Sequence, residues 1–237
     1  MSRFVYGVNP VLEALRARPG DVVRVLVERG KADRVAKAAR EAGVRVLEVE
    51  RGELSQRSRG GVHQGAGAEL AEFRYAELED LVPGATFLLV LDGVTDPQNL
   101  GALIRSAHAL GADGVVVPKD RSAGVTPAVS KAAAGALEHG KLARVTNLAR
   151  AIEQMKESGI WTVALAADGD RELESLDLKL PTALVLGSEG SGVRPLVRKT
   201  CDHVARLPMV GEIGSLNVSA AGAIALYEVA RQRRVGR

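Results

Sequence analysis

The sequence predicts an α/β protein in two parts, a small α/β unit followed by a larger unit built on a parallel sheet. Short apolar segments alternate with helix-like segments, which is typical of a parallel sheet covered by helices on both faces. A stretch rich in Gly, Ser and Arg and then an acidic stretch ending in Pro-Gly interrupt this alternation over residues 51–84. The 237 residues are enough for a small domain and a larger one.

The first part, up to residue 70, alternates between helix and strand. "VNPVLEALRAR" is typical of a helix and "DVVRVLVE" of a strand, while "KADRVAKAAREAG" predicts an amphipathic helix that ends at Gly43 before the strand "VRVLEVE". The stretch "RGELSQRSRGGVHQGAGAEL" combines turn residues with charge, so we predict loops over residues 51–70. The acidic "AEFRYAELEDLVPG" predicts a linker over residues 71–84, between a domain at 1–70 and a domain at 85–237.

The second part repeats the alternation with more strongly apolar strands. The predicted strands are residues 86–92, 114–118, 161–166, 182–187 and 203–208. Predicted helices follow most of them, at residues 97–111, 126–140 and 147–159 and after Asn217. Ligands of parallel α/β sheets bind beyond the carboxyl ends of the strands, so we expect the chemistry in the loops that follow those ends.

Charge is unevenly distributed along the chain. Residues 1–68 carry thirteen Lys or Arg against eight Asp or Glu, whereas the rest carries nineteen against twenty-one. A basic patch is typical of a protein that binds a polyanion such as RNA, although an ordinary solvated surface with excess Arg has the same composition. The short cluster "RQRR" at residues 231–234 is a second basic patch.

The cysteine and histidine content argues against disulfides and metal sites. Cys201 is the only cysteine, and the first residues lack the apolar core of a signal peptide, so we expect a cytoplasmic protein. The four histidines lie far apart in the sequence. Cys201 and His203 are close together, but two ligands do not complete a zinc site, so we predict no metal.

Two of the strand-to-helix loops carry candidate polar residues. In residues 91–112, Asp96 and Pro97 predict a helix start, and the polar candidates are Asn99 and Arg105, which lie about 120° apart on an ideal helix. In residues 184–193, glycines surround Glu189 in a spacing that does not match the dinucleotide pattern G-x-G-x-x-G. No Walker A sequence occurs either, so a dehydrogenase and a P-loop hydrolase are disfavoured. Arg105 as a solvated helix residue and Glu189 as a turn cap remain open alternatives.

The third candidate loop lies in "MVGEIGSLNVSAAGAIALYEV", residues 209–229. Ser215 and Asn217 precede a helix whose first turns are unusually small, and both are preferred N-cap residues. Small residues permit a tight helix crossing or a subunit interface, and ordinary close packing predicts the same composition.

Taken in order, the three loops resemble the signature motifs of the SpoU or TrmH branch of the SPOUT superfamily, which are RNA ribose 2′-O-methyltransferases. The matching segments are "NLGALIRSA", "GSEGSG" and "LPM" followed by "SLNVSAA". "LPM" departs mildly from the "IPM" of many relatives, which a contact through the backbone tolerates. "YGVNPVLEAL" and "GGVHQG" resemble the L30e-like amino-terminal RNA-binding domain of the RlmB group.

This resemblance implies an L30e-like domain, then a parallel-sheet α/β-knot domain with a carboxyl-terminal trefoil knot, a bound S-adenosylmethionine and a homodimer. The residues that it implies for the cofactor are Gly187, Leu207 and Leu216. The residues that it implies for catalysis are Asn99, Arg105, Glu189, Ser215 and Asn217. Plausible RNA contacts in the Gly-rich segment are Arg57, Arg59, His63 and Gln64, with solvated loop residues as the alternative.

The implied reaction is methylation of a ribose 2′-hydroxyl of a guanosine in 23S rRNA. The alternatives are a tRNA ribose 2′-O-methyltransferase, a non-catalytic RNA-binding or ribosome-assembly protein on the same fold, and a doubly wound protein that binds another nucleotide. The role of Arg105 also stays open, because a guanidinium is almost always protonated. It either takes the hydroxyl proton after strong perturbation or binds the target phosphate while another group takes that proton.

Overall fold

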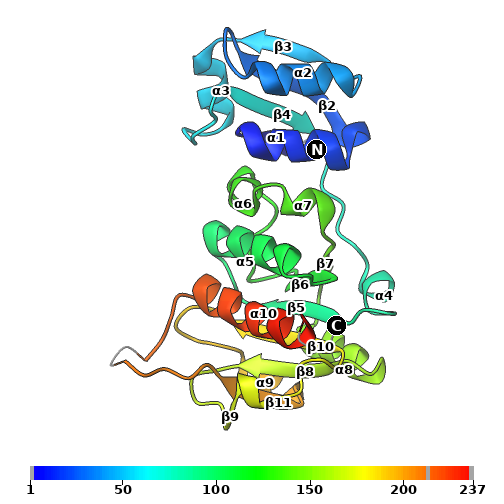
Figure 1. Cartoon of the computed structure of the whole chain (residues 1–237), viewed down its shortest axis with the longest axis vertical. Helices are drawn as coiled ribbons and strands as arrows, with labels where there is room; N and C mark the ends of the chain where they lie inside the picture. Colours follow the sequence, from blue (N-terminus) through cyan, green and yellow to red (C-terminus); the bar gives the residue numbers. More distant parts are fainter. Residues whose placement is uncertain (1–2, 212–213, 235–237) are drawn as a thin grey trace. The chain divides into compact units, whose positions relative to one another are not determined.

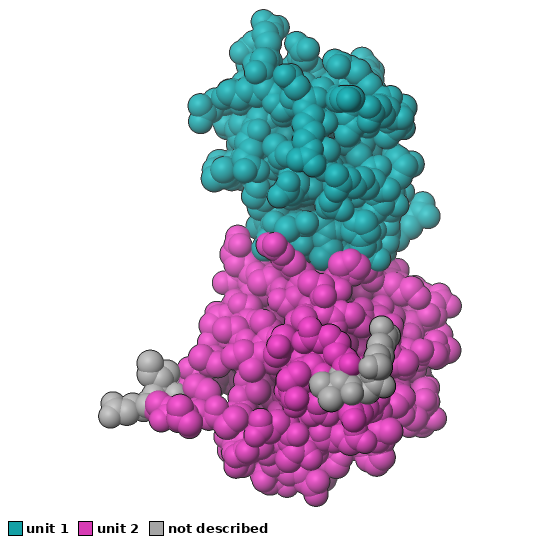
Figure 2. Space-filling model, viewed as in Figure 1, with its two compact units in different colours: residues 1–74, 124–139 teal, residues 75–123, 140–237 magenta. Residues whose placement is uncertain are grey.

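The structure is a computed structural model that describes residues 3–211 and 214–234 (Figure 1). The chain divides into two compact units (Figure 2). Unit 1 comprises residues 1–74 together with 124–139, and unit 2 comprises residues 75–123 and 140–237. Among the residues that the structure describes, each unit contains one β-sheet, of four strands in unit 1 and of seven in unit 2.

Unit 1 is a mixed sheet with helices. Its strands, in spatial order, are β1 (Arg3–Tyr6), β4 (Ala66–Leu70), β2 (Val22–Glu28) and β3 (Val46–Val49). Its helices are α1 (Val8–Ala17), the 3-10 turn η1 (Pro19–Asp21), α2 (Asp33–Glu41), α3 (Arg51–Arg57), α6 (Pro127–Ala133) and α7 (Ala136–His139). Only β2 and β3 run parallel, and β4 is antiparallel to both of its neighbours.

The prediction of loops over residues 51–70 holds for residues 58–65 and is wrong for the two ends of the stretch, where α3 and β4 lie. Strand β4 has the sequence "AGAEL", whose small residues carry little strand signal. The residues of β4 are small because neighbouring side chains fill the space around the strand. A Cβ on Gly67 would lie 2.5 Å from the ring of Phe4. The strand is therefore selected by packing between β1 and β2, which a local pattern does not contain.

Residues 124–139 pack within unit 1 although they follow β6 of unit 2 in the chain. Helix α6 packs against β1, and α7 packs against α1. The guanidinium of Arg3 donates to both carboxylate oxygens of Glu138, at 2.9 and 2.5 Å, and it also lies over the ring of Phe73. The sequence predicted a helix over residues 126–140 but not its packing against β1 and α1.

Unit 2 contains the predicted parallel sheet. Its strands, in spatial order, are β7 (Leu142–Val145), β6 (Gly114–Pro118), β5 (Phe87–Asp92), β10 (Thr182–Gly187), β8 (Trp161–Leu165), β11 (His203–Arg206) and β9 (Arg171–Glu172). Every neighbouring pair in this sheet is parallel. Strands β5 and β10 are buried along their whole length, as expected at the centre of a covered sheet.

Helices cover both faces of this sheet (Figure 1). They are α4 (Leu78–Leu81), α5 (Pro97–Ala109), α8 (Leu148–Glu157), the 3-10 turn η2 (Leu173–Ser175), α9 (Pro195–Thr200) and α10 (Val218–Arg234). Helices α5 and α10 pack together on one face, and α8 and α9 on the other. The side chains of β10 alternate accordingly, since Val185 joins the core beneath α8 and α9 while Leu186 lies near Gly222 of α10.

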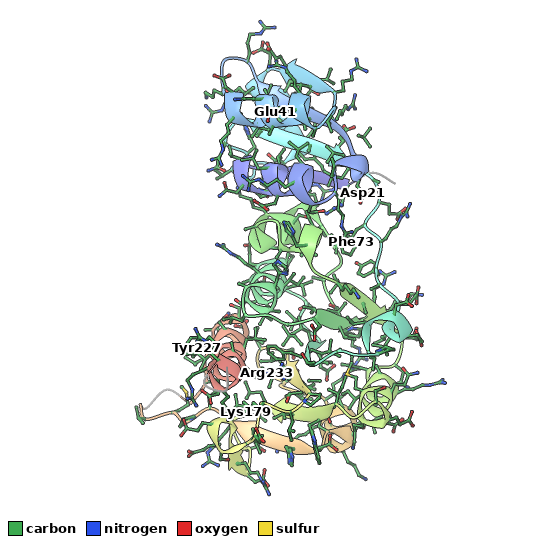
Figure 3. All side chains as sticks on the ribbon, turned by 45° about the vertical axis from the view of Figure 1, so that its right-hand side comes forward. Asp21, Glu41, Phe73, Lys179, Tyr227 and Arg233 are labelled. Atoms are coloured by element: carbon green, nitrogen blue, oxygen red, sulfur yellow. The ribbon has the colours of Figure 1, made fainter. Side chains whose placement is uncertain are left out.

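The last helix is anchored at its carboxyl end (Figure 3). The guanidinium of Arg233 donates to the carbonyl oxygens of Thr86, Leu178 and Leu180 at 2.8 to 3.0 Å and lies over the ring of Phe87. Tyr227, on the same helix, is half exposed. No helix in the described part of the chain is both long and apolar enough to cross a membrane.

Candidate active site

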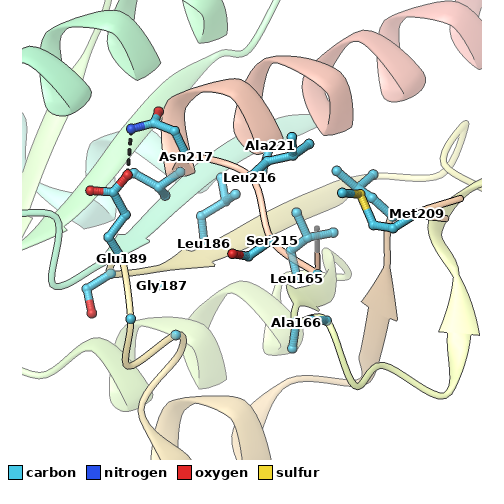
Figure 4. Close-up of a pocket in the computed structure, with 17 residues that line it drawn as sticks. Leu165, Ala166, Leu186, Gly187, Glu189, Met209, Ser215, Leu216, Asn217 and Ala221 are labelled. Carbon is cyan, nitrogen blue, oxygen red and sulfur yellow. Dashed lines mark hydrogen bonds between the residues drawn. The ribbon is translucent and has the colours of Figure 1, made fainter. Parts of the chain in front are cut away.

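A pocket of about 470 Å³ lies at the carboxyl ends of the unit 2 strands (Figure 4). Its floor comes from Leu165 and Ala166 at the end of β8 and from Leu186 and Gly187 at the end of β10. The segment 214–218 that leads into α10 forms another wall. The pocket thus lies where ligands of parallel sheets bind, and its volume is in the range of small-molecule sites.

The glycine-rich loop after β10 turns back tightly over the strand end. Ser188 and Gly192 exchange backbone hydrogen bonds of 3.2 and 3.0 Å, and Gly190 and Gly192 have φ angles of 89° and 64°. A Cβ on Gly187 would lie 1.9 Å from the carbonyl carbon of Gly192. Only glycine therefore fits at position 187, and this close approach fixes the loop that carries Glu189.

Three polar side chains from distant parts of the sequence meet beside this pocket. The Nδ2 group of Asn217 donates to Glu189 Oε1 at 2.5 Å and to Asn99 Oδ1 at 3.1 Å. Asn99 Nδ2 donates to Glu189 Oε2 at 3.5 Å. Asn99 is 8% exposed and comes from the first turn of α5, which Asp96 caps. The three side chains form a closed ring of hydrogen bonds.

Asn217 has a second role at the start of α10. Its Oδ1 accepts hydrogen bonds from the backbone N–H of Ser219 at 2.9 Å and of Ala220 at 3.4 Å, as an N-cap residue does. The positive end of the helix dipole therefore lies next to the Glu189 carboxylate. The two explanations that the sequence left open for this asparagine, a cap and a site residue, are both compatible with the structure.

The pocket collects most of the residues that the resemblance implied. Those that line it are Gly187, Glu189, Leu207, Ser215, Leu216 and Asn217. Leu165, Ala166 and Met209 line it too and were not predicted as site residues. The rule that ligands bind at strand ends could have indicated the first two, because they end the predicted strand 161–166.

Arg105 lies apart from this pocket. It is on the exposed side of α5, does not line the pocket, and its side chain has no hydrogen bond or ion pair to any residue in the described ranges. The spacing of six from Asn99 turns it away from the ring around the helix axis. In a single chain, Asn99, Glu189 and Asn217 thus meet beside the pocket, and Arg105 does not join them.

The four RNA candidates of unit 1 divide into two kinds. Arg57 forms ion pairs with Glu53 and Glu69, and His63 is buried, with Ser55 Oγ at 3.2 Å from Nε2 and the Gly65 N–H donating to Nδ1. These two side chains hold α3 and the Gly-rich loop in place.

Arg59 and Gln64 are exposed and have positive φ angles. Gln64 Oε1 accepts the Val8 N–H at the start of α1, at 3.3 Å. Of the four candidates, Arg59 is thus the side chain most available to a ligand.

The lone cysteine lies in a protected environment. Burial raises the pKa of the Cys201 thiol to about 12, and Asp202 adds to this effect. His203 stacks on Trp161 with ring centroids 5.7 Å apart. Within residues 3–211 and 214–234, no three His, Cys, Asp or Glu side chains gather as metal ligands would.

Two family models match this chain and together cover most of it. Residues 86–227 match the SpoU rRNA methylase family, and residues 4–76 match the RNA 2′-O ribose methyltransferase substrate-binding domain. The chain therefore belongs to the SpoU rRNA methylase family. It is an RNA 2′-O-ribose methyltransferase that uses S-adenosylmethionine, as the resemblance of the three loops implied.

Individual relatives agree with this assignment. The chain is 45% identical over 239 residues to a 23S rRNA (guanosine-2′-O-)-methyltransferase RlmB of Pseudomonas aeruginosa, covering 97% of this chain and 96% of the relative. It is 44% identical over 243 residues to the protein of that name in Pseudomonas syringae, covering 98% and 97%.

A solved structure also covers the whole chain. The SpoU methyltransferase AviRb of Streptomyces viridochromogenes, in complex with AdoMet, has a TM-score of 0.85 and 28% identity, covering 100% of this chain and 92% of that one.

Proposed function

We propose that this protein methylates the ribose 2′-hydroxyl of a guanosine in 23S rRNA, in the cytoplasm, with the pocket beside Asn217 as its methyl-donor site. The observation that carries this proposal is the ring of Asn99, Glu189 and Asn217 at the edge of a glycine-built pocket. The names of the Pseudomonas relatives support the choice of 23S rRNA.

The residues of the pocket fit S-adenosylmethionine. Two features of the pocket suit an adenosine. The tight turn of the loop over Gly187 leaves no room for a Cβ, and the apolar side chains of Leu207 and Leu216 can flank a flat base. Bound there, the cofactor would supply a methyl group on a sulfonium sulfur; the hydroxyl oxygen would bond to this methyl carbon as the carbon–sulfur bond breaks, with S-adenosylhomocysteine as the leaving group and the hydroxyl proton passed to a base. The protein's main task is thus to position that hydroxyl.

The polar ring would perform this positioning. Glu189 accepts from both asparagines, so its carboxylate orients both amides. Both Nδ2 hydrogens of Asn217 are used by Glu189 and Asn99, so the donor left for the ribose is the second Nδ2 hydrogen of Asn99. Ser215, two residues before Asn217, adds a hydroxyl to the same wall. Because each member is held by the other two, the arrangement is organised before the substrate binds.

We further propose a homodimer, with a trefoil knot formed around the loop that follows β10 and the loop that precedes α10. Helix α10 exposes Ile224 and Tyr227 beside small residues, which suits a close contact with a second copy. The absence of Arg105 from the residues that line the pocket supports a site that two protomers complete. Arg105 would then act as the base or bind the target phosphate.

Transfer of a labelled methyl group to purified 23S rRNA, with tRNA as the comparison, tests the proposed reaction. We expect label in 23S rRNA at a single guanosine ribose, and label in tRNA alone would contradict the proposal.

Single-turnover pH profiles of Arg105→Ala and Arg105→Lys test the arginine. If the alkaline side of the pH–rate profile shifts with the substitution, Arg105 acts as the base. If it does not shift, the result supports phosphate binding by Arg105.

A further inference from the structure

A second cavity, of about 430 Å³, lies at the same edge of the unit 2 sheet. It is formed by Pro118 at the end of β6, by the segment 146–149 that begins α8 and by Leu196 and Val197 of α9. Its polar lining comes from Asp120, Arg121, Asn147 and Arg194. No function described above uses it.

A buried carboxylate holds one of these arginines in place. Asp92, at the end of β5, is 1% exposed, and its two oxygens accept from Arg194 Nε at 2.6 Å and from the Arg194 backbone N–H at 2.8 Å. The two terminal nitrogens of Arg194 make no hydrogen bond to any residue in the described part of the chain. A fixed guanidinium edge thus remains free to donate to a ligand.

The cavity also offers an acceptor. Asp120 is exposed at its lining, and among residues 3–211 and 214–234 its carboxylate has no hydrogen bond or ion pair. Arg194 is already paired with the buried Asp92, which does not line the cavity, so the lining adds one further cation, Arg121, and one carboxylate, Asp120. A charge-balanced cavity with separate donors and acceptors between apolar walls suits a polar planar group better than a bare phosphate.

The cavity is connected to the active site by two loops. The loop after β10 contributes Glu189 to the first pocket and Arg194 to this one, and Asp92 is the register partner of Gly187 on the neighbouring strand. On the other side, Ala123 N–H donates to the carbonyl of Val94 at 3.1 Å, which ties the segment of Asp120 to the turn before Asn99. Strand β5 lies between the strands whose ends meet the two cavities, β10 for the first and β6 for the second.

We propose that this cavity binds the guanine base of the nucleotide that is methylated, a specificity site that rests on the proposed function. Guanine presents the N1–H and N2 amino donors on one edge and the O6 and N7 acceptors on another. Asp120 accepts from the donor edge, and Arg194 donates to O6 or N7. Pro118, Leu148 and Leu196 supply the apolar surface against which the ring packs.

An isosteric substitution tests this assignment. Asp120→Asn replaces an acceptor by a mixed group, and Glu153→Gln is its matched control, an exposed position on α8 outside the cavity. The substrates are an RNA with guanosine at the methylated position and the same RNA with inosine, which lacks only the 2-amino group. The readout is the ratio of kcat/KM for the two RNAs in the full-length protein.

We expect the wild type and Glu153→Gln to prefer guanosine by about tenfold, the value of one hydrogen bond to a charged group. Asp120→Asn should lower kcat/KM for guanosine and bring the ratio close to one. An unchanged ratio in Asp120→Asn, or an equal loss on both RNAs, overturns the proposal.

Dissociation constants for the same RNAs, measured without methyl donor, separate this proposal from the proposed function. A wild type that prefers guanosine in binding but transfers no methyl group contradicts the proposed reaction and leaves the base site standing. A wild type that methylates 23S rRNA without distinguishing guanosine from inosine in either measurement contradicts the base site alone.

Discussion

Asn217 combines two tasks that a single substitution can separate. Its Oδ1 caps α10, and its Nδ2 binds Glu189 and Asn99. An aspartate keeps the capping oxygen but turns the donor into a second acceptor. The capping of α10 and the proposed catalytic role therefore respond differently to Asn217→Asp.

We predict that Asn217→Asp retains a melting temperature near that of the wild type and loses methyl transfer by about a hundredfold or more, because the carboxylate repels Glu189 and opens the ring. Calorimetric melting and single-turnover transfer check the two parts. Adding Glu189→Gln to this variant restores a donor opposite an acceptor and should recover part of the activity. Full activity in Asn217→Asp alone would contradict the role of the ring.

Cys201 provides a pH-dependent prediction. Burial raises the pKa of its thiol from 9.0 to about 12, so the folded protein keeps the proton that the unfolded chain has lost. The resulting stabilisation is complete below pH 9 and declines as the pH rises from 9 toward 12. We expect a thiol reagent at pH 8 to react far more slowly with the folded than with the urea-unfolded protein. Equal rates would contradict the burial of this thiol.

At the scale of elements, the sequence predicts those with a strong periodic or apolar pattern and misses those that packing selects. Strands β5, β6, β8 and β10 follow the predicted segments because they consist mainly of Val, Leu and other apolar residues, and β11 follows the segment predicted at 203–208. Strand β4 consists mainly of small residues, and β7 is the four-residue segment LARV, so neither carries a strong apolar signal. A local pattern cannot show that Phe4 fills the space over Gly67.

The same distinction applies to the site residues. The pocket residues were predicted from motifs. A motif is recognised by the order of its residues along the chain, so it needs no knowledge of which residues the fold brings together. Arg57 and His63 were interpreted as RNA contacts, but their neighbours Glu69 and Ser55 are known only from the structure. Leu165 and Ala166 carry no polar signal, and their place in the pocket follows from strand order alone.

The close approach at Gly187 makes a sharp prediction for the loop after β10. Gly187→Ala places a methyl group 1.9 Å from the Gly192 carbonyl carbon, so the backbone must shift, at a cost of about 1–3 kcal/mol. We expect S-adenosylmethionine affinity, measured by calorimetry, to fall at least about tenfold. Gly211→Ala is the control, because nothing lies within 4 Å of a Cβ there. Equal affinities in the two variants would contradict the claim that the close approach at Gly187 shapes the cofactor site.

At the scale of the whole molecule, an ion pair joins residues 135 positions apart in the sequence within unit 1. The side chains of Arg3 and Glu138 are 11% and 2% exposed, and the buried Nε of Arg3 has no partner among the described residues. Breaking one partner of such a pair leaves an uncompensated buried charge, which is much more costly than removing both.

We predict that Glu138→Gln destabilises the protein by about 3–5 kcal/mol in urea unfolding, because Arg3 then lies buried without a counter-charge. Arg3→Met combined with Glu138→Leu removes both charges and should recover most of the lost stability. Equal losses in the single and the double variant would show that packing, rather than the ion pair, holds this segment.

The membership of residues 124–139 in unit 1 also bears on how such enzymes can be recombined. Grafting residues 1–74 alone onto another catalytic body would leave Arg3 without its carboxylate and uncover the apolar sides of β1 and α1. Unit 1 is thus discontinuous in the sequence, and a working chimaera has to take both of its segments, residues 1–74 and 124–139, from the same parent protein.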